Sequence, residues 1–188
     1  MNDSLINRCG WAKLELDVKY HDTEWGVPVY DDQKLFEFII LEMAQAGLSW
    51  SIILKKRENY RKAYDNFNPM LIAHYDNYKK LNLLEDIGIV RNKLKIAASI
   101  INAQAFLKIQ DEFKSFSNYI WQFTENKVIY NRPFSLQEIP NSTELSVKIS
   151  KELKTKGFKF LGPITCYAFL QAVGIVNDHV TSCFRYND

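Results

Sequence analysis

Two good metal ligands stand close together near the end of the chain, in the stretch NDHVTSC. His179 and Cys183 are four residues apart, and a helix beginning after Asp178 would place both side chains on one face. Imidazole and thiolate groups both bind zinc, but two ligands fill only half of a tetrahedral site. The other two ligands must be found before such a site can be called catalytic or structural.

The N-terminal segment offers two further ligands of the same types. The chain has only three histidines and three cysteines, and Cys9 and His21 lie together in CGWAKLELDVKYH. With His179 and Cys183 they would form a Cys2His2 set, which suits zinc and leaves no position for a catalytic water. HDTEWG is also not the H-E-x-x-H arrangement of zinc proteases. We therefore expect a structural zinc that ties the two ends of the chain together.

Spacing alone leaves two alternatives to this zinc site. The four side chains could be unrelated buried cysteines and histidines, or Cys9 and Cys183 could form a disulfide. The start of the chain, MNDSLINRCG, lacks the apolar region of a secretory signal, and no apolar run approaches the ~18 residues of a membrane span. We therefore expect the cytoplasm and no membrane partner, and a reducing compartment disfavours the disulfide.

A carboxylate on an apolar helix face is the second candidate for chemistry. On a helix over 33–46, Gln33, Lys34 and Glu37 fall in one polar arc, whereas Glu42 lies among apolar side chains. No cation stands one turn away from Glu42, and burying an unpaired carboxylate costs several kcal/mol. Either a backbone group or a distant cation meets this carboxylate, or it accepts hydrogen bonds from a cationic or N–H-rich ligand.

Aromatic residues cluster in the segments on both sides of this helix. Trp11, Tyr20 and Trp25 precede it, and Trp50 follows it. Aromatic rings around one buried carboxylate would make a pocket for a flat cationic heterocycle, because the ring faces stack and the carboxylate accepts N–H groups. Each ring taken singly is better explained as core, so the pocket hypothesis depends on the carboxylate.

These side chains must be positioned by a mostly helical fold. Hydrophobic residues make up 47% of the 188 residues, enough for a sizeable core, so we expect a single domain over 1–188 with two lobes. Strand patterns are scarce, which predicts an all-α protein, and two prolines in 125–141 predict a loop. Apolar periodicity and capping residues predict helices at about 31–46, 50–67, 69–76, 77–85, 91–109, 116–124, 142–156 and 162–176.

Binding to nucleic acid would depend on local basic clusters, because the net charge is only +2. LKKRENYRK places five cations in one helix, and LLEDIGIVRNKLKIAASI predicts two helices joined by a tight turn at Gly88. Backbone N–H groups at such a turn suit a phosphate, as in helix-hairpin-helix elements that hold DNA without reading its sequence. The usual second glycine of that hairpin is absent, and a solvated charged surface is the alternative.

Several longer blocks together resemble one enzyme family. They are RCGW, YHDTEWGVP, LFEFIILEMAQAGLSW, ILKKRENYR, KGFKFLGPITCY and VNDHVTSC, and they run through nearly the whole chain. The sequence is similar to the DNA-3-methyladenine glycosylase I family, the constitutive bacterial glycosylases of base-excision repair. The resemblance implies an all-α helix-hairpin-helix glycosylase fold with one structural zinc, whose ligands would be Cys9, His21, His179 and Cys183.

The resemblance also implies roles for the residues of the pocket. Glu42 would be the catalytic and base-binding carboxylate that recognises a base flipped out of the duplex. Tyr20 and Trp50 would form the stacking walls, and Trp25 and Trp11 would support them. Recognition of damaged DNA would then depend on side chains that bind no metal.

The turn after the Glu42 helix would complete the implied site. Gly47 and Leu48 would act as the DNA wedge that fills the gap left by the flipped nucleotide, with Gln45 close by. The chain departs from the family between Trp11 and Tyr20, where AKLELDVK replaces a proline-and-tyrosine stretch. The second tyrosine of the family's pocket therefore has no clear equivalent.

The implied reaction is hydrolysis of the N-glycosidic bond of 3-methyladenine in double-stranded alkylated DNA, with free 3-methyladenine as product. The methylated base is positively charged, so its bond is already weak, and Glu42 would favour the cation over neutral adenine. IVRNKLKIAASIINAQ offers neither an Asp nor a persuasive buried Lys, so we expect a monofunctional enzyme without strand cleavage. We also expect a monomer. The rivals are a zinc-pinned module that binds lesions without excising them and a purely structural interaction domain.

Overall fold

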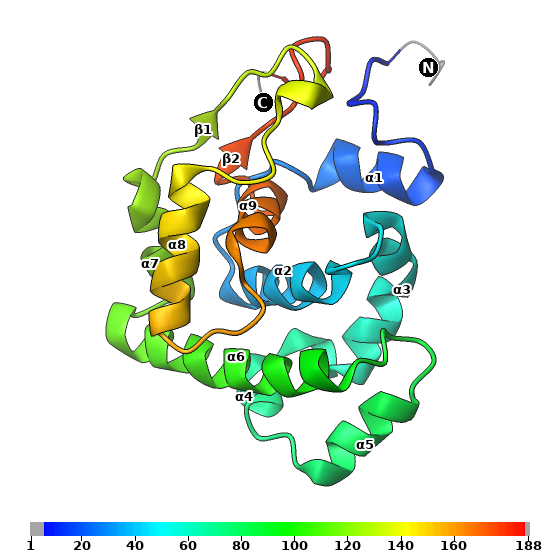
Figure 1. Ribbon diagram of the computed structural model, residues 1–188, viewed down its shortest axis with the longest axis vertical. Coiled ribbons are helices and arrows are strands. Elements are labelled where there is room, and N and C mark those ends of the chain that lie inside the picture. The colour runs from blue at the N-terminus through cyan, green and yellow to red at the C-terminus, as the bar shows by residue number, and fades with distance from the viewer. Residues whose placement is uncertain (1–5, 187–188) are drawn as a thin grey trace.

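The computed structural model describes residues 6–186 as an assembly of helices around one central helix (Figure 1). The expectation of an all-α protein is confirmed, because the two strands in this range have two residues each. The helices are α1 (Glu15–Thr23), α2 (Asp32–Gln45), α3 (Trp50–Ala63), α4 (Pro69–Ile72), α5 (Asn77–Glu85), α6 (Lys93–Phe113), α7 (Phe116–Trp121), α8 (Glu144–Thr155) and α9 (Pro163–Ala172).

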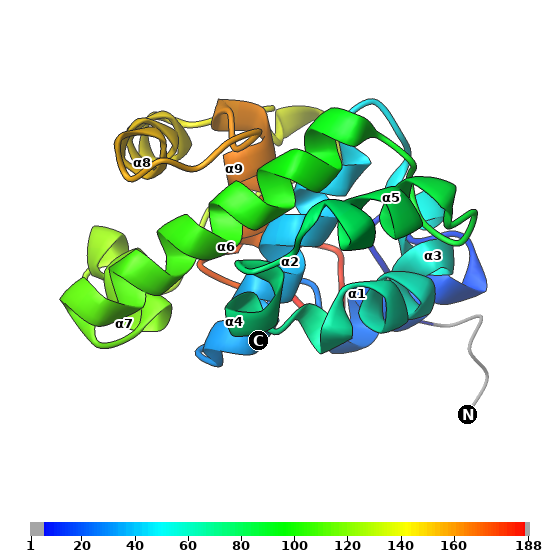
Figure 2. The same cartoon turned by 90° about the horizontal axis from the view of Figure 1, so that it is seen from below.

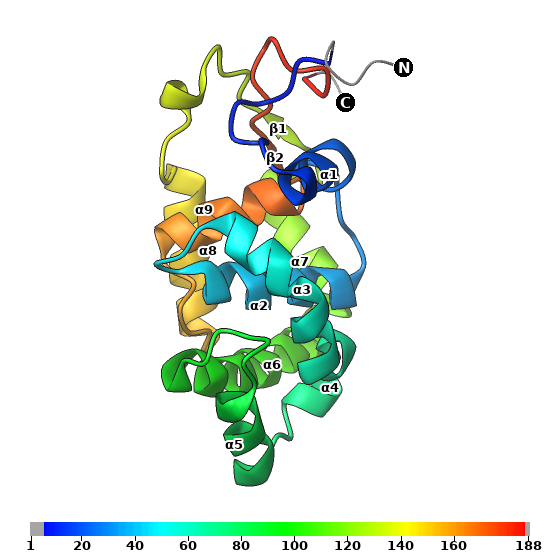
Figure 3. The ribbon, with the colours of Figure 1, turned by 90° about the vertical axis from the view of Figure 1, so that its right-hand side faces the viewer.

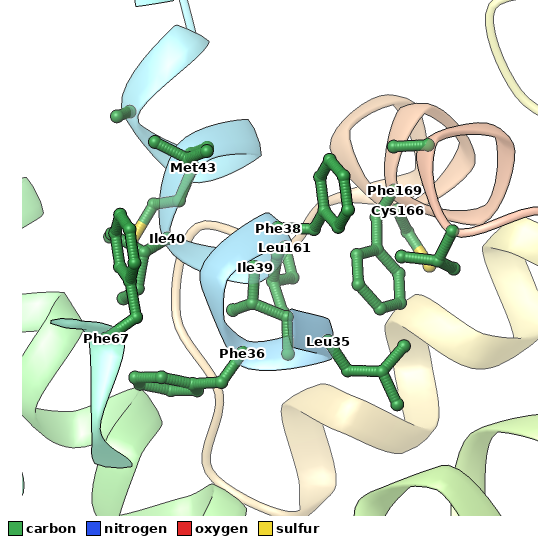
Figure 4. Packing of buried hydrophobic residues seen from close by; sticks show 14 of the residues in the cluster. Leu35, Phe36, Phe38, Ile39, Ile40, Met43, Phe67, Leu161, Cys166 and Phe169 are labelled. Atoms are coloured by element: carbon green, nitrogen blue, oxygen red, sulfur yellow. The ribbon is translucent and has the colours of Figure 1, made fainter. Parts of the chain in front are cut away.

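The central helix α2 begins and ends where its sequence predicts. Asp31 is the N-cap and accepts a hydrogen bond from the backbone N of Lys34. Gly47, with φ of +83°, follows the last turn and adopts the left-handed region that glycine tolerates. Helix α2 buries its apolar side chains and contacts α6, α7 and α9. Figure 4 shows Phe38 of α2 next to Phe169 of α9. Burial on nearly all sides makes α2 the rigid support for Glu42.

Helix α1 has no counterpart among the predicted helices. Its segment, ELDVKYHDT, has few apolar residues and no side chain that caps its start. The side chains that it buries are Asp17, Tyr20 and His21. A helix whose buried face is polar or amphipathic has no apolar periodicity to detect, and here that face contains two predicted site residues.

The two predicted C-terminal metal ligands do not lie on a helix, so that prediction was wrong. His179 and Cys183 lie in a turn after β2 (Val176–Asn177), which pairs in parallel with β1 (Ile129–Tyr130). Asp178 is not a helix cap. Its buried carboxylate accepts hydrogen bonds from the Tyr167 hydroxyl at 2.5 Å and from two side-chain amides. The turn brings the two ligands together without helical spacing.

The two ends of the described chain lie side by side (Figures 1 and 3). The backbone N of Phe184 donates to the carbonyl of Asn7 at 2.9 Å. The N-terminal segment that carries Cys9 therefore runs next to the turn that carries Cys183. Residues 6–186 contain no helix with the length and apolar character needed to cross a lipid bilayer.

The predicted helix pair on either side of Gly88 is present as α5 and α6 (Figure 2). Several backbone N–H groups that we expected to bind phosphate already donate within the protein. Asn92 caps α6 and accepts from the backbone N of Leu94 and Lys95, and the hydroxyl of Tyr60 accepts from Val90. Contacts with phosphate from this turn would therefore come mainly from exposed cationic side chains.

The basic helix α3 is only partly available to a nucleic acid. Arg57 is buried and forms ion pairs with Glu24 and Glu37, each at 2.7 Å. Glu37 also binds Arg61 at 2.9 Å and Lys34 at 3.1 Å. These cations neutralise a buried carboxylate, so the interpretation of this cluster as a solvated or DNA-facing surface was wrong for Arg57.

Candidate functional site

The four predicted metal ligands meet in one buried cluster. The ligand atoms of Cys9, His21, His179 and Cys183 all lie within 4.8 Å of one another. The Sγ atom of Cys183 is 3.4 Å from Nε2 of His21 and 3.5 Å from Nδ1 of His179, and Sγ of Cys9 is 3.6 Å from the same Nδ1. Zinc bonds of normal length to sulfur and nitrogen place tetrahedral ligands about 3.3–3.8 Å apart. The donor set and its spacing fit a tetrahedral metal ion.

The second nitrogen of each histidine ring is held by a neighbouring acceptor. Nδ1 of His21 lies 2.8 Å from the carboxylate of Asp22, which Arg8 binds in turn. Nε2 of His179 lies 3.2 Å from the carbonyl oxygen of Trp25. Such partners fix the tautomer and the orientation of metal-binding imidazoles. Each ring therefore presents its other nitrogen to the cluster.

The cluster also favours a thiolate. The hydrogen bond with the Cys9 thiol, followed by those with the ring nitrogens of His179 and His21, lowers the pKa of Cys183, while the same thiol contact raises the pKa of Cys9. Metal ions bind the thiolate form of cysteine. Among the described residues all three cysteines are free, so the structure gives no support for the alternative of a Cys9–Cys183 disulfide.

The Cys/His cluster is continuous with the aromatic residues beside it. The rings of Trp25 and His179 are 4.6 Å apart, and those of Trp11 and His21 are 5.3 Å apart, both edge to face. A Cβ atom added at Gly26 would come within 3.0 Å of the His179 ring. The position of the indoles therefore depends on the position of the metal ligands.

A cavity of about 400 Å³ opens next to these aromatic residues. This volume suits one small organic molecule. Six predicted residues line the cavity: Trp11, Tyr20, Trp25, Glu42, Gln45 and Trp50. Gly47 and Leu48 do not line it; they lie on the exposed turn between α2 and α3, where Leu48 is 38% exposed.

The opposite wall of the cavity comes from segments that the sequence analysis did not assign to the site. The loop before α8 contributes Leu136, Ile139, Pro140 and Asn141 to this wall, and α9 contributes Ile164, Tyr167, Ala168 and Gln171. The buried Asp178 accepts hydrogen bonds from Tyr167 and Gln171. Because Asp178 precedes the ligand His179, the metal cluster and this wall are held by the same turn.

Among the described residues, Glu42 is the only carboxylate that lines the cavity. Its side chain is 5% exposed, and no described residue donates a hydrogen bond to it or forms an ion pair with it. Burial raises the pKa of Glu42 to about 8. The contrast with Glu37, which three cations neutralise, shows that Glu42 has no structural counterion.

Two polar atoms of the neighbouring rings also have no partner. The hydroxyl of Tyr20 and the indole Nε1 of Trp50 are buried and have no hydrogen-bond partner among the described residues. The two rings touch, with centroids 5.2 Å apart and planes at 49°. A base between parallel rings needs about 7 Å, twice the normal contact distance. A flat ligand would therefore stack on one of these rings rather than between them.

Asp17 occupies the part of α1 where no second pocket tyrosine was found. It stands one helical turn before Tyr20 and is buried. One carboxylate oxygen accepts a hydrogen bond from the Ser51 hydroxyl at 2.9 Å, and the other has no partner among the described residues. This bond joins α1 to the start of α3, so it fixes Trp50 relative to Tyr20.

The helix after the hairpin does contain a buried lysine, which corrects the expectation from sequence. Lys95 is 9% exposed, and its Nζ donates to the carbonyls of Ala44 and Ala46 at 2.8 and 2.7 Å. It satisfies the carboxyl end of α2, where a cation is favourable. Lys95 does not line the cavity, so it is placed to support α2 rather than to act as a nucleophile.

Replacing Lys95 should therefore weaken the fold. Lys95→Met leaves two helix-end carbonyls without their charged donor, and we expect the free energy of unfolding to fall by about 2 kcal/mol. Denaturant unfolding measures the change. Lys93→Met, on the exposed face of the same helix, is the matched control and should stay within about 0.5 kcal/mol of the unmodified protein. Equal stabilities of the two variants would contradict this role.

Comparison with known proteins agrees with the fold and shows the family. A model of the methyladenine glycosylase family matches residues 11–186. The chain is 46% identical to DNA-3-methyladenine glycosylase 1 of Escherichia coli (strain K12), over 96% of this chain and 97% of the relative. It is 43% identical to DNA-3-methyladenine glycosylase of Haemophilus influenzae, over 95% of this chain and 97% of that relative.

The fold is also similar to solved structures of 3-methyladenine DNA glycosylase I. A crystal structure of 3-methyladenine DNA glycosylase I shares 46% identity and a TM-score of 0.93, covering 96% of this chain and 100% of that chain. The Staphylococcus aureus enzyme, solved to show how it recognises 3-methyladenine, shares 35% identity and a TM-score of 0.91 over 95% of each chain. The chain therefore belongs to the methyladenine glycosylase family, which confirms the expected assignment to a family of enzymes.

Proposed function

We propose that this protein is a monofunctional base-excision repair glycosylase that releases 3-methyladenine from alkylated double-stranded DNA. The observation that carries the proposal is Glu42, a buried carboxylate without a counterion in an aromatic cavity of about 400 Å³. Family membership supports the reaction class, because relatives with 46% and 43% identity are DNA-3-methyladenine glycosylases.

The cavity would select the damaged base by its charge. A base cannot reach Glu42 from within the duplex, so the nucleotide must be flipped out, at a cost that is lower for a damaged base. Tyr20 or Trp50 would stack on the base, and the carboxylate of Glu42 would accept its exocyclic N–H. A cationic base in the cavity lowers the pKa of Glu42 and favours its ionised form, and this pairing stabilises the cationic base more than neutral adenine, which gives selectivity.

The reaction itself needs little help with the leaving group, because 3-methyladenine carries a positive charge that weakens its glycosidic bond. Bond cleavage moves the electron pair to the base and leaves an oxocarbenium-like sugar, which water attacks to give an abasic site. Lys95 is bound to two carbonyls and lies outside the cavity. No lysine in the described part of the chain lines the cavity, which supports simple hydrolysis without strand cleavage.

Leu48 and Gly47 would fill the space that the flipped nucleotide leaves. Their turn lies directly after Gln45, which lines the cavity, and the side chain of Leu48 is partly exposed. Arg91 and Lys93, both exposed at the start of α6, would bind phosphates. We propose that the protein acts as a monomer, because one chain provides both the cavity and these contacts.

The ion that we propose for Cys9, His21, His179 and Cys183 is zinc. Two thiolates and two imidazoles at tetrahedral spacing suit zinc among the common metals. The four protein ligands fill its coordination, so zinc would supply structural stability. These four residues, which we call the zinc clasp, hold Trp25 and the α9 wall in place. Side chains outside the zinc clasp would recognise the base.

One assay tests the proposed function directly. Duplex DNA methylated at adenine N3 is incubated with the protein, and the released base is separated and identified. We expect free 3-methyladenine and intact strands that break only after alkaline treatment of the abasic site. Binding to methylated DNA with no base release would instead favour the lesion-binding module, and no salt-dependent DNA binding would favour a structural domain.

Glu42 also predicts how stability depends on pH. Its pKa is about 8 in the folded protein, against about 4.3 for an unfolded glutamate. Between these values the folded state keeps a proton that the unfolded state has lost, so stability falls as pH rises from about 4 to about 8 and then levels off. Glu42→Gln should remove this contribution. The variant's advantage in unfolding midpoint should therefore grow between about pH 5 and pH 8, and a constant difference would contradict the assignment.

A further inference from the structure

The connection between α8 and α9 contains a residue in an unfavourable backbone conformation. Phe160 has φ of +59°, in the left-handed region that bulky residues rarely occupy. Its ring is 43% exposed, and no described aromatic ring packs on it. Burial of the ring does not explain why a phenylalanine stands at this position.

Buried side chains fix the backbone on both sides of Phe160. The side-chain amide of Asn102, on α6, accepts from the backbone N of Lys159 at 2.7 Å and donates to its carbonyl at 3.0 Å. The hydroxyl of Ser150, on α8, donates to the carbonyl of Leu161 at 2.7 Å. Strained conformations persist where the surrounding structure over-determines them, and they concentrate at functional sites. The anchors hold Phe160 at the tip of a rigid bend.

This bend leads into the α9 wall of the cavity. Four residues after Phe160, Ile164 lines the cavity and is 64% exposed. The α8–α9 connection, the α2–α3 turn with Leu48, and the start of α6 lie along one edge of the molecule in Figure 3 and face the viewer in Figure 1. Lys159, next to Phe160, is exposed. The edge therefore combines exposed apolar side chains with cations around the cavity.

We propose that Phe160 is a second DNA-contacting side chain, which stacks on a base next to the flipped nucleotide while Lys159 binds a phosphate. The inference rests on the proposed function, because it requires DNA at this edge. A rigid aromatic ring stacks on any base and needs no sequence-specific contact. Because side chains of two helices anchor the bend, the ring is preorganised for stacking. Little conformational entropy is therefore lost when DNA binds.

Affinity for duplex DNA that contains a tetrahydrofuran abasic analogue tests this contact without relying on catalysis. Phe160→Gly removes the ring but permits the left-handed backbone. We expect it to weaken binding about tenfold, the size of one lost base–aromatic stack. Phe160→Tyr keeps the ring and should bind like the unmodified protein. Met70→Ala removes an apolar side chain that is even more exposed than Phe160, from α4 on the opposite side of the molecule (Figure 2), and should not alter binding.

Two further measurements separate this contact from damage to the fold or the pocket. Thermal unfolding and binding of free 3-methyladenine, followed by tryptophan fluorescence, should be nearly unchanged in Phe160→Gly. Equal DNA affinity of Phe160→Gly and the unmodified protein would overturn the proposal, as would an equal loss in Phe160→Tyr. If the unmodified protein binds the abasic duplex in a ring-dependent manner but releases no base, the proposed function fails and the contact stands.

Discussion

Glu42→Gln should abolish most base release while leaving the protein folded and more stable. Glutamine keeps the shape of the side chain but cannot become an anion, so a cationic base loses its counterion inside the cavity. Removal of one preorganised electrostatic partner commonly costs about 10²–10³-fold in rate. We expect a loss of this size in single-turnover release of 3-methyladenine from methylated duplex DNA at neutral pH.

The gain in stability follows from the same burial. The pKa of about 8 reports the cost of an ionised carboxylate that no described residue neutralises. At about pH 8 this cost is on the order of 4 kcal/mol, since each pKa unit corresponds to about 1.4 kcal/mol. Glutamine carries no such cost, so thermal unfolding of Glu42→Gln should occur at a higher temperature than that of the unmodified protein.

A matched control distinguishes recognition from general electrostatics. Glu37 stands on the same helix and is equally buried, but Arg57, Arg61 and Lys34 neutralise it. Glu37→Gln should lose stability, because it leaves those cations without their anion, and it should retain base release in the molecules that remain folded. Loss of activity in both variants with no difference in stability would exclude a special role for Glu42.

The comparison of these two glutamates also shows what the sequence can and cannot predict. Helical periodicity placed Glu42 among apolar neighbours, because the pattern of α2 is strong and the deviation is local. The same periodicity placed Glu37 in a polar arc, yet Glu37 is buried. Its partners Arg57 and Arg61 come from another helix, and no local pattern contains information about such a pairing.

The prediction of the Cys/His cluster depended on two features of the sequence, the residue types and the helical spacing of His179 and Cys183, and only the first agrees with the structure. The small number of histidines and cysteines made Cys9, His21, His179 and Cys183 a candidate set, and the structure brings these four side chains together. The helical spacing of His179 and Cys183 was wrong, because the bonds to a metal ion constrain ligand atoms and not the backbone between them. A turn after β2 meets that constraint as well as a helix would.

The sequence predicted neither the far wall of the cavity nor helix α1, and the physical reasons differ. The wall comes from residues about 100 positions from Glu42, such as Leu136 and Ile164. An apolar residue by itself predicts a place in the hydrophobic core, so these residues did not indicate a cavity wall. Helix α1 buries Asp17, Tyr20 and His21, so its inward face has no apolar stripe. Asp17 satisfies one oxygen through Ser51 on α3, a contact that depends on the tertiary structure.

Cys183→Ala should remove the bound metal and lower stability by about 3 kcal/mol or more, because structural zinc sites contribute directly to folding. For a chain of this size, that loss corresponds to a fall of roughly 10 °C in unfolding midpoint. Metal analysis of freshly purified protein should give about one zinc per chain, and about none for the variant.

Cys166 provides the matched control for the metal site. It is buried in α9 and does not belong to the cluster, so Cys166→Ala should keep the metal and lose only the stability of one buried thiol.

At a temperature where Cys183→Ala is still folded, the defect of Cys183→Ala should appear mainly as weaker binding of substrate. His179 would lose its metal bond and Trp25 its fixed neighbour, while Glu42 remains on α2. Well under one metal ion per unmodified chain would refute the zinc clasp, and stoichiometric binding of another metal would correct the identity of the ion while preserving its structural role.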